Sequence, residues 1–490
     1  MQKVFHNPSR LESLAKHKYC FPDYIMMENA AGAIKNLILE QKPSAGTKCL
    51  ILCGKGNNGG DGYALARLLL GTVEPVLFSL EPPAATEAKS QHLMCKKMGI
   101  PFVTKKALFE LLNDYSKKQP FPLIIVDCLY GTGIKGELLP QVQEIIEASN
   151  KAQATRIACD ISSGLTFDAD YTVTMGQYKL ALFSDQAKKV SGKIIVASLG
   201  IERSLFESVL PPCAYLVTKE DIKLPLRTNK AAHKGTYGHT AVFTGQKAGA
   251  SIICATAAMN FGSGLTTLIA GENSGLKQFK VSPELMISSD IPAKATCLVF
   301  GPGMDSCAPQ TLNQIYAWFD MPANKNPAAV FDAGVFGNEA FTTLLQKIAS
   351  KQGARIVLTP HLLEFTRLCQ SLKLLPKGKD LLTVEILANS PETKLLLGQK
   401  ITSMFPNVTV VIKSANSFIA SAGQTYIVQD GSPSLSKGGS GDVLAGMIAS
   451  LLAQGYTAQE AAITACEAHA LAGTKHGANS YDLSPLKLIR

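Results

Sequence analysis

A glycine-rich break between a predicted strand and a predicted helix constrains this chain more than any other feature. Residues 48–70 read KCLILCGKGNNGGDGYALARLLL, an apolar run followed by a glycine-rich loop and then by apolar residues at helical spacing. Glycines let a backbone approach a ligand closely, and the first N–H groups of a helix carry partial positive charge. The loop matches neither GxGxxG nor GxxxxGK[ST], because Asn57, Asn58 and Asp61 stand in it. We therefore expect it to hold a phosphorylated ligand.

A second glycine-rich loop lies near the other end of the chain. Residues 437–442 read KGGSGD and precede an apolar run over 443–452 that is long enough for a helix, so Asp442 lies at the predicted helix start. Either loop alone is weak evidence, because a tight turn would have the same composition. Two such loops, each containing an aspartate, favour binding sites over turns.

Length and composition indicate a multidomain globular protein. The 490 residues exceed what one core usually supports, and 46% apolar with 18% charged residues is ordinary for a folded chain. The net charge of +10 is scattered and only 7% of residues are aromatic, which favours small anionic ligands over nucleic acid. The 12 cysteines lack metal-type pairing, and no apolar run is long enough to span a membrane. We expect a cytoplasmic protein with reduced thiols and no nucleic-acid or membrane partner.

Short strand-like runs alternate with helical runs in the first half. Strands are predicted over residues 49–53, 74–80, 123–128, 156–160, 171–175 and 193–197. This alternation is typical of a parallel sheet covered by helices, an α/β, Rossmann-like three-layer sandwich. Ligands of such sheets bind at the carboxyl ends of the strands, where Asp127 and Asp160 fall together with the first loop. Each aspartate alone could be a cap or turn residue, but two of them after neighbouring strands favour a site.

A domain boundary is predicted near residue 222, where Pro211, Pro212 and Pro225 and the polar residues 227–230 interrupt the pattern. The domains would then be 1–222 and 223–490. In the second domain the alternation restarts, with strands predicted over residues 240–244, 296–300, 328–332, 354–358 and 408–413. Gly303, Asp332, His361, Glu364 and Lys413 follow or end these strands. A second α/β layer structure is expected.

Four segments of the first half together resemble the epimerase domain of the NAD(P)H-hydrate repair proteins: GNNGGDGYALARLL, VDCLYGTG, CDISSGL and YTVTMGQYK. The resemblance implies a potassium ion held by Asn58, Asp127 and Ser163, and oxygen ligands suit such a hard cation. It also implies that Asp127 and Asp160 are catalytic, with Asp160 facing the hydrated nicotinamide. The residues that it assigns to the substrate phosphates are Asn57, Asn58, Gly59, Gly60, Asp61, Thr132, Gly133, Ile134 and Lys135.

The second half resembles the dehydratase half of the same repair proteins, which has a ribokinase-like fold. The segments that carry this resemblance are HKGTYG, GQKAGAS and GGSGDVLAG. It implies that Ala250, Gly303, His361 and Asp442 face the hydrated cofactor, and that ADP is the phosphoryl donor, with Mg²⁺. The residues that it assigns to the nucleotide are Lys413, Ser414, Ala415, Asn416, Ser417, Gly439, Ser440 and Gly441. The two resemblances cover nearly the whole chain, which is identified as a member of the bifunctional repair family.

Asp442 has a chemical role that fits this resemblance. A hydroxyl leaves readily once it has become a phosphate ester, so a base must take its proton as it attacks phosphorus. Asp442 is placed to act as that base, while the N–H groups of Gly439 to Gly441 stabilise the charge on the phosphoryl group. The alternative is that Asp442 only caps its helix.

Several positions depart from the family pattern, and they leave alternatives open. The departures are Ser162, Gly334, Leu362, Leu363, Ser414, Ser432 and Ser434, together with a short connection over 164–171. They permit a protein in which one half is active and the other is a scaffold or ligand sensor. A third reading is a ribokinase-like kinase of a small alcohol with an N-terminal regulatory domain. We expect a homo-oligomer; the sequence does not separate ADP from ATP or NADHX from NADPHX.

Overall fold

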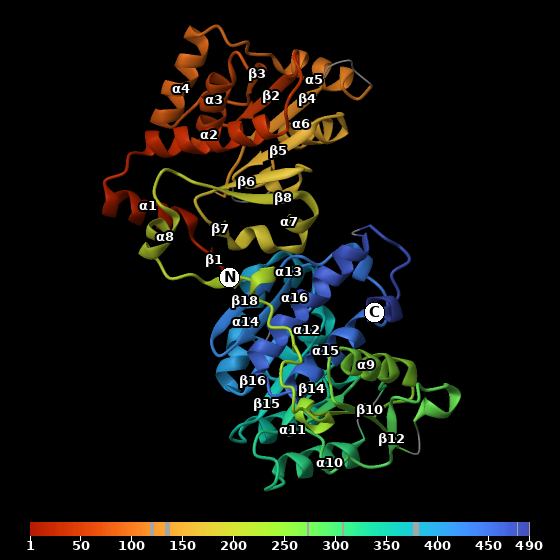
Figure 1. Ribbon diagram of the computed structural model, residues 1–490. Coiled ribbons are helices and arrows are strands. Elements are labelled where there is room, and N and C mark those ends of the chain that lie inside the picture. Colours follow the sequence, from red (N-terminus) through yellow and green to blue (C-terminus); the bar gives the residue numbers. More distant parts are fainter. Residues whose placement is uncertain are drawn as a thin grey trace. The chain divides into compact units, whose positions relative to one another are not determined.

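The computed structural model describes residues 1–117, 122–132, 138–271, 274–305, 308–375, 382–477 and 479–489 (Figure 1). These residues form two compact units, Lys3–Cys213 and, together with Met1–Gln2, Ala214–Arg490. The second unit begins before the boundary that the sequence predicted near residue 222. The reason is strand β9 (Ala214–Leu216), which pairs with β18 (Gln424–Val428) of the second unit.

The helices and strands of the first unit follow in chain order. They are β1 (Gln2–Phe5), α1 (Pro8–Tyr19), α2 (Asp23–Glu40), β2 (Lys48–Cys53), α3 (Asn57–Leu69), β3 (Glu74–Ser79), α4 (Thr86–Lys97), α5 (Lys105–Asp114), β4 (Leu123–Cys128), α6 (Pro140–Lys151), β5 (Thr155–Cys159), β6 (Tyr171–Met175), β7 (Tyr178–Lys179), α7 (Asp185–Val190), β8 (Lys193–Ala197) and α8 (Arg203–Phe206).

Six strands of this unit form one parallel sheet in the order β3-β2-β4-β5-β6-β8. These are the six strands predicted from the sequence, and no strand end differs from its predicted position by more than one residue. Alternate residues of β2 enter different cores, because successive side chains of a strand point to opposite faces. Cys49, Ile51 and Cys53 pack with α2 and α3, whereas Leu50 and Leu52 pack with α5 and α6. The unit therefore has three layers.

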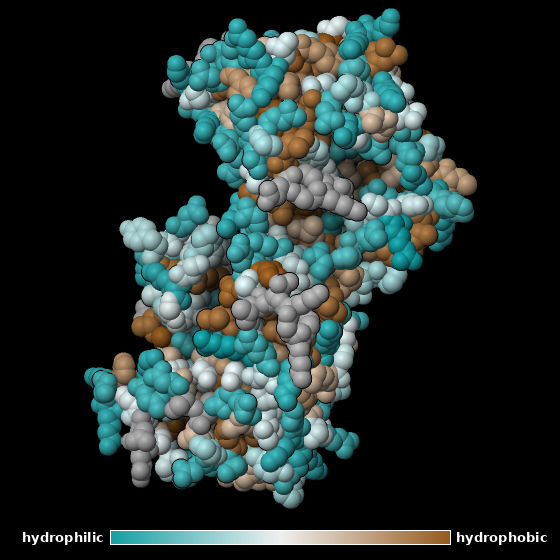
Figure 2. Space-filling view, turned by 180° about the vertical axis from the view of Figure 1, so that it is seen from behind, coloured by the Kyte–Doolittle hydropathy of each residue, from teal (hydrophilic) through white to brown (hydrophobic). Residues whose placement is uncertain are grey.

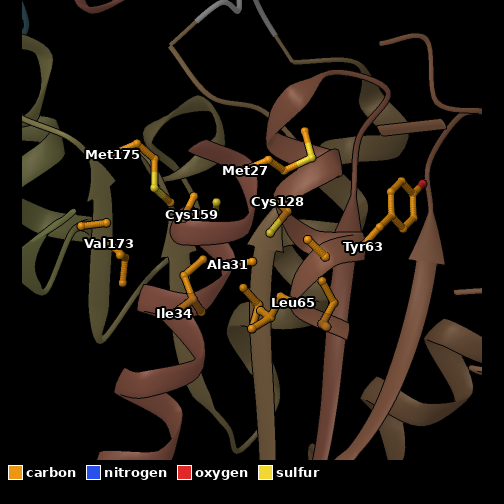
Figure 3. Close-up of a cluster of buried hydrophobic side chains, with 14 of the residues drawn as sticks. Met27, Ala31, Ile34, Tyr63, Leu65, Cys128, Cys159, Val173 and Met175 are labelled. Carbon is orange, nitrogen blue, oxygen red and sulfur yellow. The ribbon is translucent and has the colours of Figure 1, made fainter. Parts of the chain in front are cut away.

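The core on the α2 and α3 face is shown in Figure 3. Met27, Ala31 and Ile34 of α2 point toward strand residues such as Cys128 and Val173. All of these side chains are buried, so the cysteines act here as small apolar residues. The pair β1–β7 was not predicted, because two to four residues carry no readable alternation.

The second unit has the following helices and strands in chain order. They are β9, β10 (His239–Thr244), α9 (Ala248–Asn260), β11 (Leu265–Ala270), β12 (Met286–Ser288), β13 (Cys297–Phe300), α10 (Pro309–Asp320), β14 (Ala328–Phe331), α11 (Glu339–Ala349), β15 (Arg355–Leu358), α12 (Leu362–Ser371), α13 (Val384–Asn389), α14 (Pro391–Met404), β16 (Val408–Ile412), β17 (Ser417–Ser421), β18, α15 (Ser440–Ala453), α16 (Ala458–Gly477) and α17 (Pro485–Leu488).

Its sheet runs β12-β11-β10-β13-β14-β15-β16-β17-β18-β9. The strands from β12 to β16 are parallel, and β17 is antiparallel to both β16 and β18. The five predicted strands are present, but β11, β12 and the β17–β18 hairpin were missed. That hairpin turns at Ala422 and Gly423, which both have positive φ, 48° and 75°. An alanine is unusual in such a turn, so the sequence signal was weak.

The two faces of this sheet carry different cores. Val242, Val299 and Val330 pack with α9, α15 and α16. Phe300 and Phe331, their neighbours along β13 and β14, form edge-on ring contacts on the other face, where α11 adds Phe341. Figure 2, which views the molecule from behind, shows hydrophilic residues spread over the visible surface of each unit, with smaller hydrophobic patches between them. No helix among the described residues is long and apolar enough to cross a bilayer.

Candidate active sites

A cavity lies where the sequence predicted the first site. Strands β2, β4 and β5 are adjacent and parallel, so the segments that follow them meet at one edge of the sheet. The cavity at this edge has a volume of about 510 Å³. Its walls include Lys55, Asn57, Asn58, Asp61, Tyr130, Thr132, Asp160 and Met175. The predicted glycine-rich loop and Asp160 therefore border the same cavity.

Backbone packing explains three glycines of this loop. A Cβ on Gly54 would lie 1.9 Å from the carbonyl oxygen of Leu129, and a Cβ on Gly59 would lie 1.9 Å from the carbonyl oxygen of Gly54. A Cβ on Gly60 would lie 2.4 Å from the methyl carbon of Met27. This close packing brings the N-terminus of α3 to the cavity, where its unpaired N–H groups suit an anion.

Asp127 lies behind the cavity wall. Its carboxylate accepts hydrogen bonds from the Ser163 hydroxyl at 2.7 Å, the Ser163 N–H at 2.8 Å and the Leu129 N–H at 3.1 Å. The side chain has no exposed surface, and this burial raises the pKa of Asp127 to about 6. Asp127 thus holds the segments after β4 and β5 together. The catalytic role of Asp127 stays a prediction.

Asn58 lies in the wall of the same cavity. Its amide nitrogen and oxygen are both buried and have no hydrogen-bond partner among the described residues. A Cβ on Gly131 would lie 3.8 Å from the Asn58 amide oxygen and 3.2 Å from Oδ2 of Asp160. Orphaned amide groups of this kind are costly to bury, so this is a place where a ligand or an ion would be stabilised.

Asp160 is paired with a buried lysine that the sequence reasoning did not single out. Lys179 donates from Nζ to Oδ1 of Asp160, and the Met175 N–H donates to the same oxygen at 3.2 Å. Asp160 also has a positive φ of 74°, a conformation that costs energy for a residue other than glycine. The sequence signal for a buried lysine was the position of Lys179 four residues after the predicted strand YTVTM, within a segment that has no other charged residue.

Lys179 is 2% exposed, and burial lowers its pKa to about 8. The carboxyl groups of Glu12 and Asp61 act in the opposite sense and favour the charged lysine. Glu12 comes from α1 and lines the cavity, and burial raises its pKa. The first site therefore contains one lysine among several acids, each with a protonation equilibrium displaced toward neutral pH.

Of the remaining predicted residues of the first site, some line the cavity and others lie outside the described residues. Thr132 lines the cavity. The Asp61 carboxyl is buried with Oδ2 3.8 Å from the Cys159 sulfur, and burial raises its pKa well above the usual range. A carboxyl in this position favours the protonated form, so anion binding at this point falls to the backbone N–H groups. Gly133, Ile134 and Lys135 lie outside the described residues.

The second predicted site lies at the start of α15. Gly439 has a φ of 93°, which turns the chain into the helix, and Asp442 follows in its first turn. Burial raises the pKa of Asp442 to about 7, and the nearby Asp332 carboxylate adds to this effect. Lys413 opposes it. A carboxyl that titrates near neutral pH is suited to take up a proton in catalysis.

Asp332 and Lys413 form a buried ion pair beside Asp442. The Lys413 ammonium donates to the Asp332 carboxylate at 2.8 Å, and Asp332 is 2% exposed. The two residues follow β14 and β16, which flank β15. A Cβ on Gly441 would lie 3.3 Å from the Lys413 nitrogen, so the predicted nucleotide residues Lys413 and Gly441 are neighbours.

His361 and Glu364 cap the start of α12. The His361 N–H donates to Glu364 at 2.9 Å, and burial lowers the pKa of the imidazole. His361 also pairs with Lys413 in an isolated parallel bridge, which brings the third strand end to the same edge. Leu362 is buried in the helix start, and Leu363 is 44% exposed. His361 therefore lies at the predicted edge of the crevice.

Glycines also shape this site. A Cβ on Gly303 would lie 2.2 Å from the Lys247 carbonyl oxygen and 3.3 Å from Cβ of Ala250, so the predicted substrate residues Ala250 and Gly303 are neighbours. A Cβ on Gly334 would lie 2.2 Å from the Met304 carbonyl oxygen. This contact explains why a glycine stands where the family has an acid, because the close backbone leaves no room for one.

Ser414 follows Lys413 and has partners of its own. Its hydroxyl donates to the Asn416 carbonyl at 2.7 Å and accepts from the ammonium of Lys394 at 3.2 Å. Lys394 is fully buried on α14 and was not singled out by the sequence reasoning. Ala415 and Asn416 complete the turn into β17, which begins at Ser417. The serine that replaces a glycine here is thus part of the hydrogen bonding of the turn.

Two family models match the chain. The model described as YjeF-related protein N-terminus matches residues 23–181, and the model described as NAD(P)H-hydrate dehydratase matches residues 241–490. The chain is 36% identical to a bifunctional NAD(P)H-hydrate repair enzyme of Helicobacter pylori, over 100% of this chain and 99% of the relative. It is 35% identical to an NAD(P)H-hydrate epimerase of Rhodopirellula baltica, over 40% of this chain and 82% of that protein.

A solved structure of an ADP/ATP-dependent NAD(P)H-hydrate dehydratase from Bacillus subtilis, co-crystallised with ATP and Mg²⁺, is 22% identical, with a TM-score of 0.45. The match covers 56% of this chain and 95% of that one. The likeness to the Helicobacter pylori enzyme extends over the full chain, and the dehydratase model alone matches more than half of it. The chain therefore belongs to the family of bifunctional NAD(P)H-hydrate repair enzymes.

Proposed function

We propose that the chain repairs hydrated NAD(P)H in two steps, one in each unit. The first unit interconverts the R and S hydrates, and the second dehydrates the S hydrate to NAD(P)H with consumption of ADP or ATP. The observation that carries this proposal is that each sheet edge gathers a lysine that is hydrogen-bonded to an aspartate at a strand end. These pairs are Asp160 with Lys179 in the first unit and Asp332 with Lys413, beside Asp442, in the second.

Epimerisation requires that the hydroxyl leave one carbon and return to its opposite face, with a proton given to the leaving oxygen and taken from the entering one. The hydroxyl leaves as water once it is protonated, and the ring nitrogen supplies the electron pair that breaks the C–O bond. Water then returns on the opposite face and gives up a proton to a base. Asp160 and Lys179 are hydrogen-bonded to each other at the cavity, so one can hold the proton that the other releases. The pKa of about 8 for Lys179 suits exchange near neutral pH.

The predicted potassium site is part of this proposal. The ligands would be oxygen atoms: the unpaired amide oxygen of Asn58, the carboxylate of Asp127 and the hydroxyl of Ser163. Oxygen ligands of this kind fit a hard monovalent cation. Among the described residues, no group of three or more His, Cys, Asp or Glu side chains forms a metal site. When bound, potassium would supply positive charge near the substrate phosphates.

Dehydration begins with phosphorylation of the hydroxyl. Asp442 accepts the hydroxyl proton as the oxygen bonds to the terminal phosphorus and the nucleotide leaves with its own bridging oxygen. The C–O bond then breaks, inorganic phosphate leaves with the oxygen and the electron pair, and loss of a proton from the neighbouring carbon restores the dihydronicotinamide ring of NAD(P)H. Lys413, hydrogen-bonded to Asp332 and next to Gly441, is placed to balance the phosphoryl charge. Mg²⁺ would be held by nucleotide phosphates and by Asp332 or Glu364, and it would neutralise phosphate charge.

Recovery of reduced-nicotinamide absorbance tests the proposal. Purified protein is mixed with R and S hydrates of NADH in the presence of K⁺ and Mg²⁺, with ADP, ATP or neither. Complete recovery with one nucleotide supports both activities and defines the donor. Recovery that stops at the S fraction would make the first unit a scaffold or sensor. A stable phosphorylated product without NADH would instead indicate a small-alcohol kinase.

Location and assembly stay predictions. A cytoplasmic location is still expected from the sequence. A homo-oligomer is still expected, and light scattering on the purified chain would define the number of subunits.

A further inference from the structure

The glycine-rich loop of the second unit is braced at both ends by helix α16. At the near end, the Ser434 hydroxyl donates to the Gly473 carbonyl of α16 at 3.0 Å, and a Cβ on Gly473 would lie 2.6 Å from the Leu435 side chain. At the far end, Nε2 of His469 lies 3.1 Å from the Ser440 carbonyl oxygen and 3.2 Å from its hydroxyl oxygen. Helix α16 therefore fixes both the entry and the exit of the loop.

His469 is neutral in this setting. Its side chain is buried, and burial lowers the pKa of the imidazole to about 4, with Lys413 contributing in the same direction and the Ser440 carbonyl opposing it. A carbonyl oxygen can only accept a hydrogen bond, so the tautomer with hydrogen on Nε2 donates to Ser440. His469 is therefore a buried residue of the second unit.

The hydrogen bond from His469 sets the direction of the next peptide group. In a trans peptide the carbonyl of Ser440 and the N–H of Gly441 point in opposite directions. A carbonyl that is held toward α16 therefore turns the Gly441 N–H away from that helix. The Ser440 N–H already donates to the Lys437 carbonyl at 3.2 Å. The N–H groups of Gly441 and Asp442 are consequently the loop donors left for a phosphoryl oxygen.

We propose that His469 is a positioning residue for phosphoryl transfer, which it promotes by orienting the Gly441 N–H through the Ser440 carbonyl. This inference rests on the proposed dehydratase function of the second unit. His469 itself makes no contact with the nucleotide or the hydrate. Its effect belongs to the transition state, where charge on the phosphoryl oxygens is greatest, so it should change kcat more than KM.

Three variants test the proposal: His469→Gln keeps a donor near the Nε2 position, His469→Asn has an amide too short to reach Ser440, and His469→Leu removes the donor. Loss of one preorganised donor typically costs about 10² to 10³ in kcat, and a misdirected donor should cost about 10 to 10². We expect this loss in kcat for the Leu and Asn variants, with KM for the S hydrate within about threefold of the parent. The Gln variant should recover most of the rate.

Cys466→Ala is the matched control, because Cys466 lies one turn earlier on α16 and is buried in the same core. It should leave kcat within about twofold of the parent. Equal rates for the Gln and Asn variants, or an equal loss in Cys466→Ala, would overturn the proposal even where the Leu variant does not fold. If the parent protein shows no nucleotide-dependent dehydration, the proposed function fails instead.

Discussion

At the scale of single residues, the central aspartates of the two sites have different partners. Asp160 has a direct cationic partner in Lys179, which is itself so deeply buried that its pKa falls to about 8. No cation is hydrogen-bonded to Asp442 among the described residues; burial and the neighbouring Asp332 carboxylate raise its pKa to about 7. In the first site a proton is held between Lys179 and Asp160. In the second site Asp442 is a base whose ionisation changes near neutral pH.

The dehydratase activity should therefore depend on the ionisation of Asp442. A base must be deprotonated to act, so kcat/KM should fall by about tenfold per pH unit below about pH 7 and level off above it. Asp442→Asn should reduce kcat by about 10² to 10⁴. The check is the pH profile of NADH recovery from pure S hydrate. A profile without a change of slope near neutral pH would exclude Asp442 as the base.

Lys179 should be required for epimerisation alone. Lys179→Met keeps the length and the apolar stem of the side chain but removes the ammonium that donates to Asp160. We expect interconversion of the hydrates to fall by about 10² or more, with conversion of the S hydrate unchanged. Separation of the two hydrates by chromatography over time measures the effect. Lys193→Met, at an exposed position on β8, is the control and should retain both activities.

At the scale of elements, the first glycine-rich loop is fixed by packing between backbones. Gly59 in the first turn of α3 lies against the Gly54 carbonyl, and Gly54 in turn lies against the Leu129 carbonyl after β4. The N-terminus of α3 is thus held close to the neighbouring strand end. Both positions require glycine because the backbone contact leaves no room for a Cβ, and neither has the positive φ that favours glycine in turns.

Gly59→Ala should consequently destabilise the first unit. Its Cβ would lie 1.9 Å from the Gly54 oxygen, and overpacking of this kind costs about 1 to 3 kcal/mol or more. Gly56→Ala is the matched control, because no atom lies within 4 Å of its Cβ and its φ of −89° suits alanine. Thermal unfolding should show a lower midpoint for Gly59→Ala only. Equal midpoints for the two variants would contradict this packing argument.

At the scale of the whole molecule, the two activities are assigned to separate units with separate cores. Asp160→Asn should leave the dehydratase intact, and Asp442→Asn should leave the epimerase intact. The hydrates are free to diffuse between protein molecules, so a mixture of the two variants should recover NADH completely from an R and S mixture. Each variant alone should not recover the R fraction.

The absorbance of reduced nicotinamide measures this complementation. Recovery by the mixture that stops at the S fraction would show that both activities must reside in one chain, or that one substitution disrupts both units. A lower thermal midpoint in either variant would identify the second of these cases.

Local sequence patterns determined the strands that position both sites. The six parallel strands of the first unit and the strands before Asp332 and Lys413 were predicted because buried parallel strands form continuous apolar runs. The strand-to-loop-to-helix order likewise placed Asn58 and Asp442 at sheet edges. Short or edge strands such as β7, β12 and the β17–β18 hairpin were missed, since their pairing depends on distant segments.

What only the tertiary structure decided is which side chains meet. Glu12 and His469 carry no local motif, and Lys179, the last residue of YTVTMGQYK, had no role assigned from the sequence. All three enter the sites because β7, α1 and α16 pack beside segments that are distant in sequence. Burial then displaces their protonation equilibria, and burial is a property of the packed core. The sequence alone thus determined the strands, the glycine-rich loops and the family, because these are written in local patterns; partners and pKa values arise from desolvation and contact, which exist only in the folded chain.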